Sequence, residues 1–205
     1  MIQMLLKGGP VTWALFACGF SALIVFLERL FNLHRAQIAA DDFLKGIYTV
    51  LGRGNTTEAA TLCEEAPGPV ARLALAAVLH HEDSAQELEE ALEAAGLEEI
   101  PRMERGLGWI ATVGKLAPLL GLLGTVLGLL EMLRALRAGA PLVQVADLSG
   151  GLWEAVTVSA LGLTVGILAY AGHNFLVGRV ESIALDMERA AASLRRHHRG
   201  AEDAE

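Results

Sequence analysis

The stretch APLLGLLGTVLGLLEML, residues 117–133, decides the fold class. It is almost wholly aliphatic, yet it contains the polar Thr125 and three glycines: Gly121, Gly124 and Gly128. Each glycine in a helix costs up to about 1 kcal/mol relative to alanine, so a soluble core helix has little use for several of them. A helix in lipid uses small residues to approach its neighbours closely. The stretch therefore predicts a membrane-spanning helix that packs tightly against another.

Three long runs of the 205 residues carry almost no charge. Gly8–Leu27 has none, Gly106–Leu130 has only Lys115, and Leu148–Val177 has only Glu154. Each run reaches the length of about 20 residues that crosses a hydrocarbon core. The alternative for the first run is a cleaved signal peptide, but no small-residue cleavage pattern follows it. The sequence thus predicts an all-α membrane protein with three transmembrane helices.

The runs and the charges between them predict the topology. Basic residues favour the cytoplasmic side of a membrane. Seven basic residues lie near the span ends on the side that holds the long loop and the tail: Arg29, Arg35, Lys45, Arg102, Arg105, Arg179 and Arg189. The other side has three: Lys7, Arg134 and Arg137. We therefore expect an outer amphipathic segment (1–9), transmembrane helices (10–33, 106–133, 148–177), a helical cytoplasmic loop domain (34–105), a short periplasmic loop (134–147) and a cytoplasmic helical tail (178–205) that prolongs the third span. A frayed terminus is the alternative for segment 1–9.

Capping signals place helices inside the loop domain. Thr56 or Thr57 can cap a helix after the turn that precedes it, and Ser84 with Glu87 has the spacing of a capping box. The domain is therefore expected to be a set of short helices.

Composition excludes several classes of function. The formal charge of −8 argues against a nucleic-acid-binding protein. Cys18 and Cys63 lie in different environments, so a disulfide is not expected, and each is interpreted as a small buried residue. The adjacent histidine pairs, 80–81 and 197–198, do not share a helix face. With no convincing nucleophile or metal-ligand spacing, we expect neither an enzyme nor a bound cofactor.

Small residues form matching strips on the second and third spans. On the second they include Ala117, Gly121, Thr125 and Gly128; on the third they are Ala155, Ser159, Gly162, Gly166 and Ala169. Such strips allow close helix packing in lipid. We expect the packing residues to be Gly121, Gly124, Gly128, Gly162 and Gly166.

Packing does not explain Glu154, because an ionisable side chain near the bilayer centre costs about 2.5 kcal/mol or more. Thr157 and Ser159 follow it, and Thr125 lies on the neighbouring span. Together these groups favour a hydrated ion path. Hydrogen bonding between helices in a non-conducting scaffold is the alternative that the residues leave open.

These residues resemble the ExbB/TolQ/MotA proton-channel family, and ExbB most closely. The motif APLLGLLGTV at 117–126 is specific to it, and GGLWEAVTVSALGLTVGILAYAGHNF at 150–175 is similar to its third span. The resemblance implies a multi-pass protein of the bacterial inner membrane that forms a homopentamer. It also implies a dimeric ExbD/TolR-like single-span partner in the pore and a TonB-like or TolA-like transducer driven by the proton motive force.

The resemblance also implies roles for individual residues. Thr125 matches the pore-lining threonine of the second span, Ser159 takes the place of the third-span threonine, and Glu154 that of the family's glutamate. Leu168 stands where a proline is common, and His173 where an aromatic is common. Protons would be the transported ion. A TolQ-like motor subunit for envelope maintenance is the alternative to TonB-dependent uptake.

Overall fold

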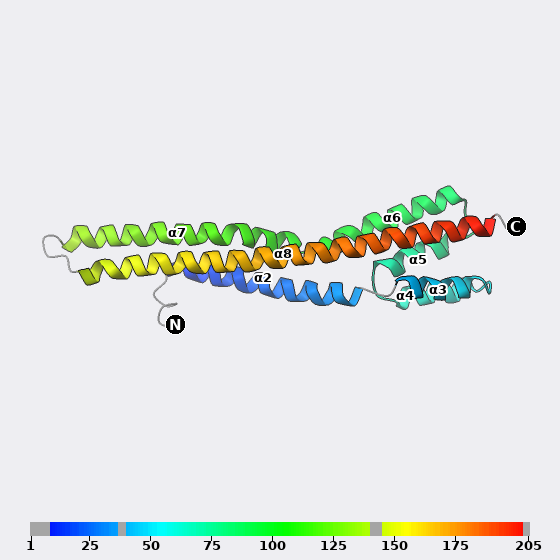
Figure 1. Ribbon diagram of the computed structural model, residues 1–205, viewed down its shortest axis with the longest axis horizontal. Coiled ribbons are helices and arrows are strands. Elements are labelled where there is room, and N and C mark those ends of the chain that lie inside the picture. The colour runs from blue at the N-terminus through cyan, green and yellow to red at the C-terminus, as the bar shows by residue number, and fades with distance from the viewer. Residues whose placement is uncertain (1–8, 37–39, 140–144, 203–205) are drawn as a thin grey trace. The chain divides into compact units, whose positions relative to one another are not determined.

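The structure, a computed structural model, describes residues 9–36, 40–139 and 145–202, and every regular element among them is a helix (Figure 1). The helices are α2 (Gly9–Ala36), α3 (Ala40–Leu51), α4 (Thr56–Glu65), α5 (Pro69–Leu79), α6 (Ala85–Glu104), α7 (Leu107–Gly139) and α8 (Val145–Glu202). Three of them, α2, α7 and α8, are long and apolar enough to cross a membrane. The predicted all-α fold with three such helices is confirmed. The predicted amphipathic segment 1–9 lies almost wholly outside the described residues.

Two helices extend further than the sequence indicated. We expected the second span to end at residue 133 and a loop to cover 134–147, but α7 continues to Gly139 and α8 begins at Val145. The reason is local, because MLRALRAG, residues 132–139, has no helix breaker before its final glycine. The tail was expected to prolong the third span, and α8 does run as one helix of 58 residues.

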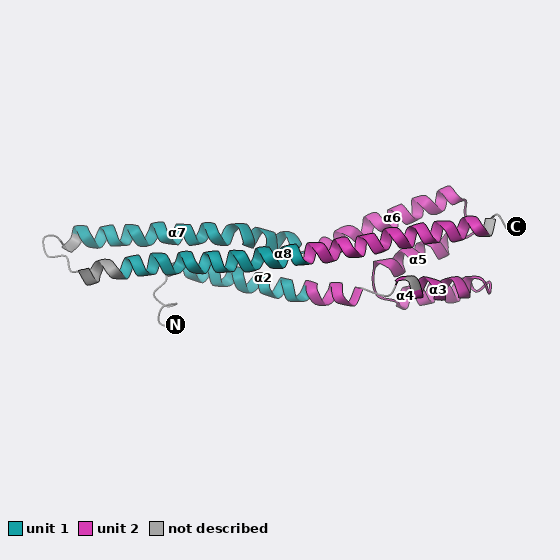
Figure 2. Cartoon of the chain, in the orientation of Figure 1, with its two compact units in different colours: residues 1–28, 106–175 teal, residues 29–105, 176–205 magenta. Residues whose placement is uncertain are grey.

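The chain divides into two compact units (Figure 2). The first comprises the described parts of residues 1–28 and 106–175, and the second comprises those of 29–105 and 176–205. The first unit therefore holds the apolar stretches, and the second holds the loop domain together with the tail.

In the first unit, α2 packs against α7 and α8. Its core is formed by Leu15, Ala117 and Val158, one residue from each helix. The indole N–H of Trp109 on α7 also donates to the hydroxyl of Ser21 on α2, at 3.2 Å. Many large aliphatic and aromatic side chains of this unit are exposed, as is typical of a surface that faces lipid or other protein copies.

In the second unit, α8 has one buried face. Its residues recur at helical spacing: Leu176, Val180, Ile183, Met187, Ala190 and Leu194. Polar contacts hold the same helix on both sides. The Tyr48 hydroxyl of α3 donates to the Ser193 hydroxyl at 3.0 Å, and Arg195 pairs with Glu89 of α6 at 2.5 Å. The tail is thus part of the folded loop domain.

The capping predictions had different outcomes. The capping box of Ser84 and Glu87 is confirmed at the start of α6. At the start of α4, neither Thr56 nor Thr57 is the cap. The side chain of Asn55 accepts the backbone N–H of Glu58, because asparagine satisfies a free helix N–H as well as threonine does.

The two cysteines are free thiols. Cys63 is buried in the second unit, and this burial raises the pKa of its thiol to about 11. The predicted small buried residue is confirmed for Cys63, whereas Cys18 is half-buried.

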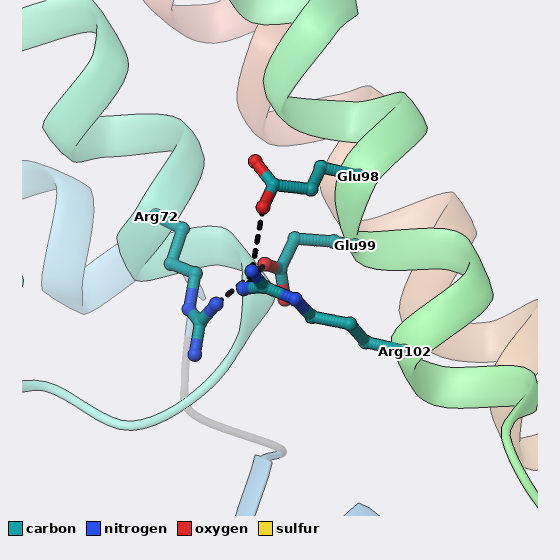
Figure 3. Close-up of polar contacts among 4 residues, drawn as sticks. All are labelled: Arg72, Glu98, Glu99 and Arg102. Atoms are coloured by element: carbon teal, nitrogen blue, oxygen red, sulfur yellow. Dashed lines mark hydrogen bonds and ion pairs between the residues drawn. The ribbon is translucent and has the colours of Figure 1, made fainter.

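A buried carboxylate joins α5 to α6 (Figure 3). One oxygen of Glu99 accepts from Arg72 of α5 and from Arg102 of its own helix, each at 2.8 Å. Arg102 also pairs with the exposed Glu98 at 2.5 Å. Burial raises the pKa of Glu99 above its ordinary value, and the charge of Arg72 opposes that increase. Glu99 is therefore the acceptor on which two half-exposed arginines converge.

We expect Glu99→Ala to lower the free energy of unfolding of the full chain in detergent by about 1–3 kcal/mol, because it removes the shared acceptor and its packed methylenes. Glu98→Ala is the matched control, and its exposed pair should contribute less than about 1 kcal/mol. Thermal unfolding of both variants followed by circular dichroism measures the difference. Equal shifts for the two would contradict a structural role for the buried carboxylate.

Candidate pore seam

All five glycines that were predicted to pack lie where α7 meets α8. A Cβ added to Gly162 would lie 2.7 Å from both the Ala117 carbonyl oxygen and the Gly121 Cα. One added to Gly128 would lie 2.9 Å from the Ala155 Cβ, and one added to Gly166 would lie 2.6 Å from a carbon of Pro118. At Gly124 it would overlap Val158. The two backbones thus approach each other as closely as glycine permits, and we call this contact the seam.

Two further glycines belong to the seam and were missed from the sequence. A Cβ on Gly114 would lie 3.3 Å from the Tyr170 backbone nitrogen, and one on Gly151 would lie 3.2 Å from the Gly128 carbonyl oxygen. Helical spacing was the available signal: Gly114 precedes Gly121 by seven residues, and Gly151 precedes Ala155 by four.

Thr125 lies on the seam, half-buried. Its hydroxyl is within 3.1 Å of the Gly121 carbonyl oxygen in its own helix and 3.3 Å of the Ala155 carbonyl oxygen in α8. The hydroxyl has one proton to donate, and both of these neighbours are acceptors. The Thr125 hydroxyl can therefore act toward other groups only as an acceptor, through a lone pair of its oxygen.

Ser159 lies one turn after Ala155, and its backbone contacts Gly121, where a Cβ would be 3.2 Å from the Ser159 carbonyl oxygen. The α8 residues at helical spacing around it, Val156 and Leu163, are exposed. On α7, Leu122 and Leu129 flank Thr125 and are exposed as well. The two hydroxyl residues therefore border an open apolar face of the seam.

Glu154 lies on a different face of α8 from Ser159. Five residues at 3.6 per turn separate their directions by about 140°. Glu154 instead heads the row that continues through Val158 and Val165, and those two pack against Leu15 and Gly19 of α2. The four predicted path residues thus do not converge on one surface.

Thr157 points away from the seam. It is two residues from Ser159, and its hydroxyl donates to the Trp153 carbonyl of its own helix at 2.8 Å. This bond satisfies the hydroxyl locally, as threonine commonly does within helices. Thr125 and Ser159 are therefore the two predicted path residues that both lie along the seam.

The first unit also contains a cavity of about 650 Å³ between α2 and α8. Its lining is aliphatic, aromatic or glycine throughout, including Phe16, Phe20, Phe26 and Phe175. A lining without side-chain hydroxyls or charges cannot solvate an ion. The seam, with its two hydroxyl residues, is the better candidate.

The sequence profile of the MotA/TolQ/ExbB proton channel family matches residues 64–189, more than half of the chain. The chain belongs to this family. It is a membrane protein of a family of proton channels, and members of such a family work in membrane complexes with partners.

Individual relatives agree. A biopolymer transport protein ExbB homolog of Methanothermobacter thermautotrophicus is 28% identical over 88% of this chain and 64% of its own length. The biopolymer transport protein exbB1 of Vibrio cholerae is 31% identical over 82% of this chain and 75% of its own. The Tol-Pal system protein TolQ of Haemophilus influenzae is 35% identical over 43% of this chain and 38% of its own. The chain thus spans 64% of the length of the first relative and three quarters of the second.

Proposed function

We propose that this chain is the channel-forming subunit of a proton-driven motor in the bacterial inner membrane. Several copies, five by family analogy, would surround the single membrane spans of a dimeric ExbD/TolR-like partner. Protons would cross along the boundary between the ring and the partner, and the resulting motion would drive a TonB-like transducer. The amino terminus would then lie in the periplasm and the tail in the cytoplasm, as the basic residues indicate.

The observation that supports this proposal best is the pair of hydroxyl residues beside the seam. Thr125 and Ser159 are the polar members of a surface whose exposed neighbours are aliphatic. Apolar walls repel charge, whereas hydroxyl oxygens hydrate a proton or accept from a protonated carboxyl without adding a fixed charge. The outward lone pair of Thr125 suits that task, because its own proton is directed at the two carbonyls.

Glu154 has a separate part in the proposal. Its row on α8 packs against α2, so we assign it to the contact between these helices near the outer entrance rather than to the pore lining. A carboxylate there would attract protons to the entrance through its charge. Thr157 would have no part in the path, because its hydroxyl donates to the Trp153 carbonyl of its own helix.

The test is reconstitution. The chain and its ExbD/TolR-like partner are placed in liposomes under a pH gradient, and proton entry is followed with an internal pH-sensitive dye. We expect flux with both proteins present and none with either alone. A complex that assembles but carries no proton flux at any gradient would refute the channel role and favour the scaffold.

A TolQ-like role is the second candidate, and the match to the Haemophilus influenzae TolQ favours it. Co-purification with the native transducer distinguishes the two. A TonB-like protein in the complex supports uptake, and a TolA-like protein supports envelope maintenance.

A further inference from the structure

We propose that the outward face of α6 docks onto the outward face of α8 in a second copy of this chain. The docking rests on the proposed function, which places several copies side by side in one membrane. In this docking, a second copy covers two surfaces of the second unit that are exposed in the single chain.

The acidic face of α6 consists of Glu90, Glu93, Leu97 and Ile100, which recur at helical spacing. All four are exposed, and Leu97 keeps 65% of its surface. The buried residues of this helix, including Leu88 and Leu92, lie on the opposite side. The acidic face is thus two carboxylates followed by two aliphatic side chains.

The basic face of α8 consists of Leu185, Arg196 and Arg199, again at helical spacing and exposed. It points away from the buried row of α8 that contains Met187 and Leu194. Along the chain it begins with an aliphatic side chain and ends with two guanidinium groups, and the exposed Glu188 and Arg189 between them carry opposite charges. The basic face therefore reverses the order of the acidic face and carries the opposite charge.

A contact within the protomer sets the relative heights of the two faces. Helices α6 and α8 run in opposite directions in the second unit (Figure 2). A carboxylate oxygen of Glu89 on α6 lies 2.5 Å from a guanidinium nitrogen of Arg195 on α8. At about 1.5 Å per residue, eight residues along α6 from Glu89 reach Leu97, and eight back along α8 from Arg195 reach Met187, two residues from Leu185. Glu90 is likewise level with Leu194, two residues from Arg196.

Copies that share one membrane orientation and are related by rotation about the membrane normal keep the same heights. When α6 of one copy faces α8 of the next, Glu90 therefore lies within about 3 Å in height of Arg196, and Leu97 lies within about 3 Å in height of Leu185. This contact joins two different surfaces, which is the kind of interface that closes a ring. Opposite charges at its distal end fix the register, and the aliphatic pair supplies the apolar centre.

Cysteine cross-linking tests the contact in the full chain. In a background with Cys18→Ala and Cys63→Ala, chains with Leu97→Cys and chains with Leu185→Cys carry different tags and are expressed together. We expect a cross-linked species that carries both tags after oxidation, and none when either variant is expressed alone. Leu79→Cys, at an exposed position at the end of α5, replaces Leu97→Cys as the control and should give no product.

The outcomes separate two failures. Cross-links between two Leu97→Cys chains, or oligomers that form without any 97–185 product, would overturn the docking and leave the channel proposal standing. The 97–185 product in a complex that conducts no protons would support the docking and refute the channel.

Charge exchange tests the same contact by a second route. Glu90→Arg and Arg196→Glu should each reduce the oligomer fraction after dilution in detergent about tenfold at low salt, and the double variant should restore it. Arg196 also lies near Tyr48, so circular dichroism first shows that each variant is folded before the oligomer fractions are compared. Absence of restoration in a folded double variant would overturn the pairing of these two faces.

Discussion

Thr125→Val is expected to lower proton flux through the reconstituted complex at least about a hundredfold while the complex stays assembled. Valine has nearly the shape of threonine, so the substitution removes a hydroxyl while it leaves the volume of the side chain at the seam almost unchanged. The substitution removes the side-chain oxygen that α7 places 3.3 Å from the Ala155 carbonyl oxygen and puts a methyl group in its place. The dye assay measures the flux, and gel filtration with the partner measures the assembly.

Two control variants isolate the hydroxyl. Thr125→Ser keeps the oxygen and should retain most of the flux. Thr112→Val makes the same chemical change elsewhere on α7, where an exposed threonine donates only to the Gly108 carbonyl at 2.7 Å, and it should have no effect on flux. Normal flux in Thr125→Val would remove Thr125 from the path, and dissociation of that variant would assign the hydroxyl to assembly.

The sequence predicted the elements of this fold well because the signals were local. Runs of about 20 uncharged residues identify membrane helices without any tertiary information. The helical spacing of apolar residues in the tail, such as Val180, Ile183 and Met187, indicated that α8 continues beyond the third span. The spacing of Ser84 and Glu87 indicated a capped α6. The error at α4 was of the same local kind, because three consecutive residues can cap and only one does.

The arrangement of the site was harder to predict because it depends on how each helix is rotated. Periodicity shows that Glu154 and Ser159 point about 140° apart, but not which of them faces α2. Contacts such as Val158 with Leu15 decide that question, and they join residues far apart in the chain. The Glu99 cluster was missed for the same reason, since its partner Arg72 belongs to another helix.

Gly162→Ala is expected to destabilise the chain in detergent by about 1–3 kcal/mol, although alanine is the better helix former. The new methyl group would lie 2.7 Å from the Ala117 carbonyl oxygen and 2.7 Å from the Gly121 Cα. Both obstacles are backbone atoms, so no side chain can rotate away and the two helices must separate. Separation also weakens the bond of Thr125 to the Ala155 carbonyl, which is already 3.3 Å long.

Gly108→Ala is the matched control for Gly162→Ala, because a Cβ at Gly108 on α7 meets nothing within 4 Å. Its alanine should leave the unfolding midpoint unchanged or raise it, since helix propensity then acts alone. The comparison therefore separates the backbone contact from the intrinsic preference of the helix. If Gly162→Ala instead raised the midpoint as Gly108→Ala does, α7 and α8 could not be in backbone contact at this seam, and a path beside Thr125 and Ser159 would lose its structural basis.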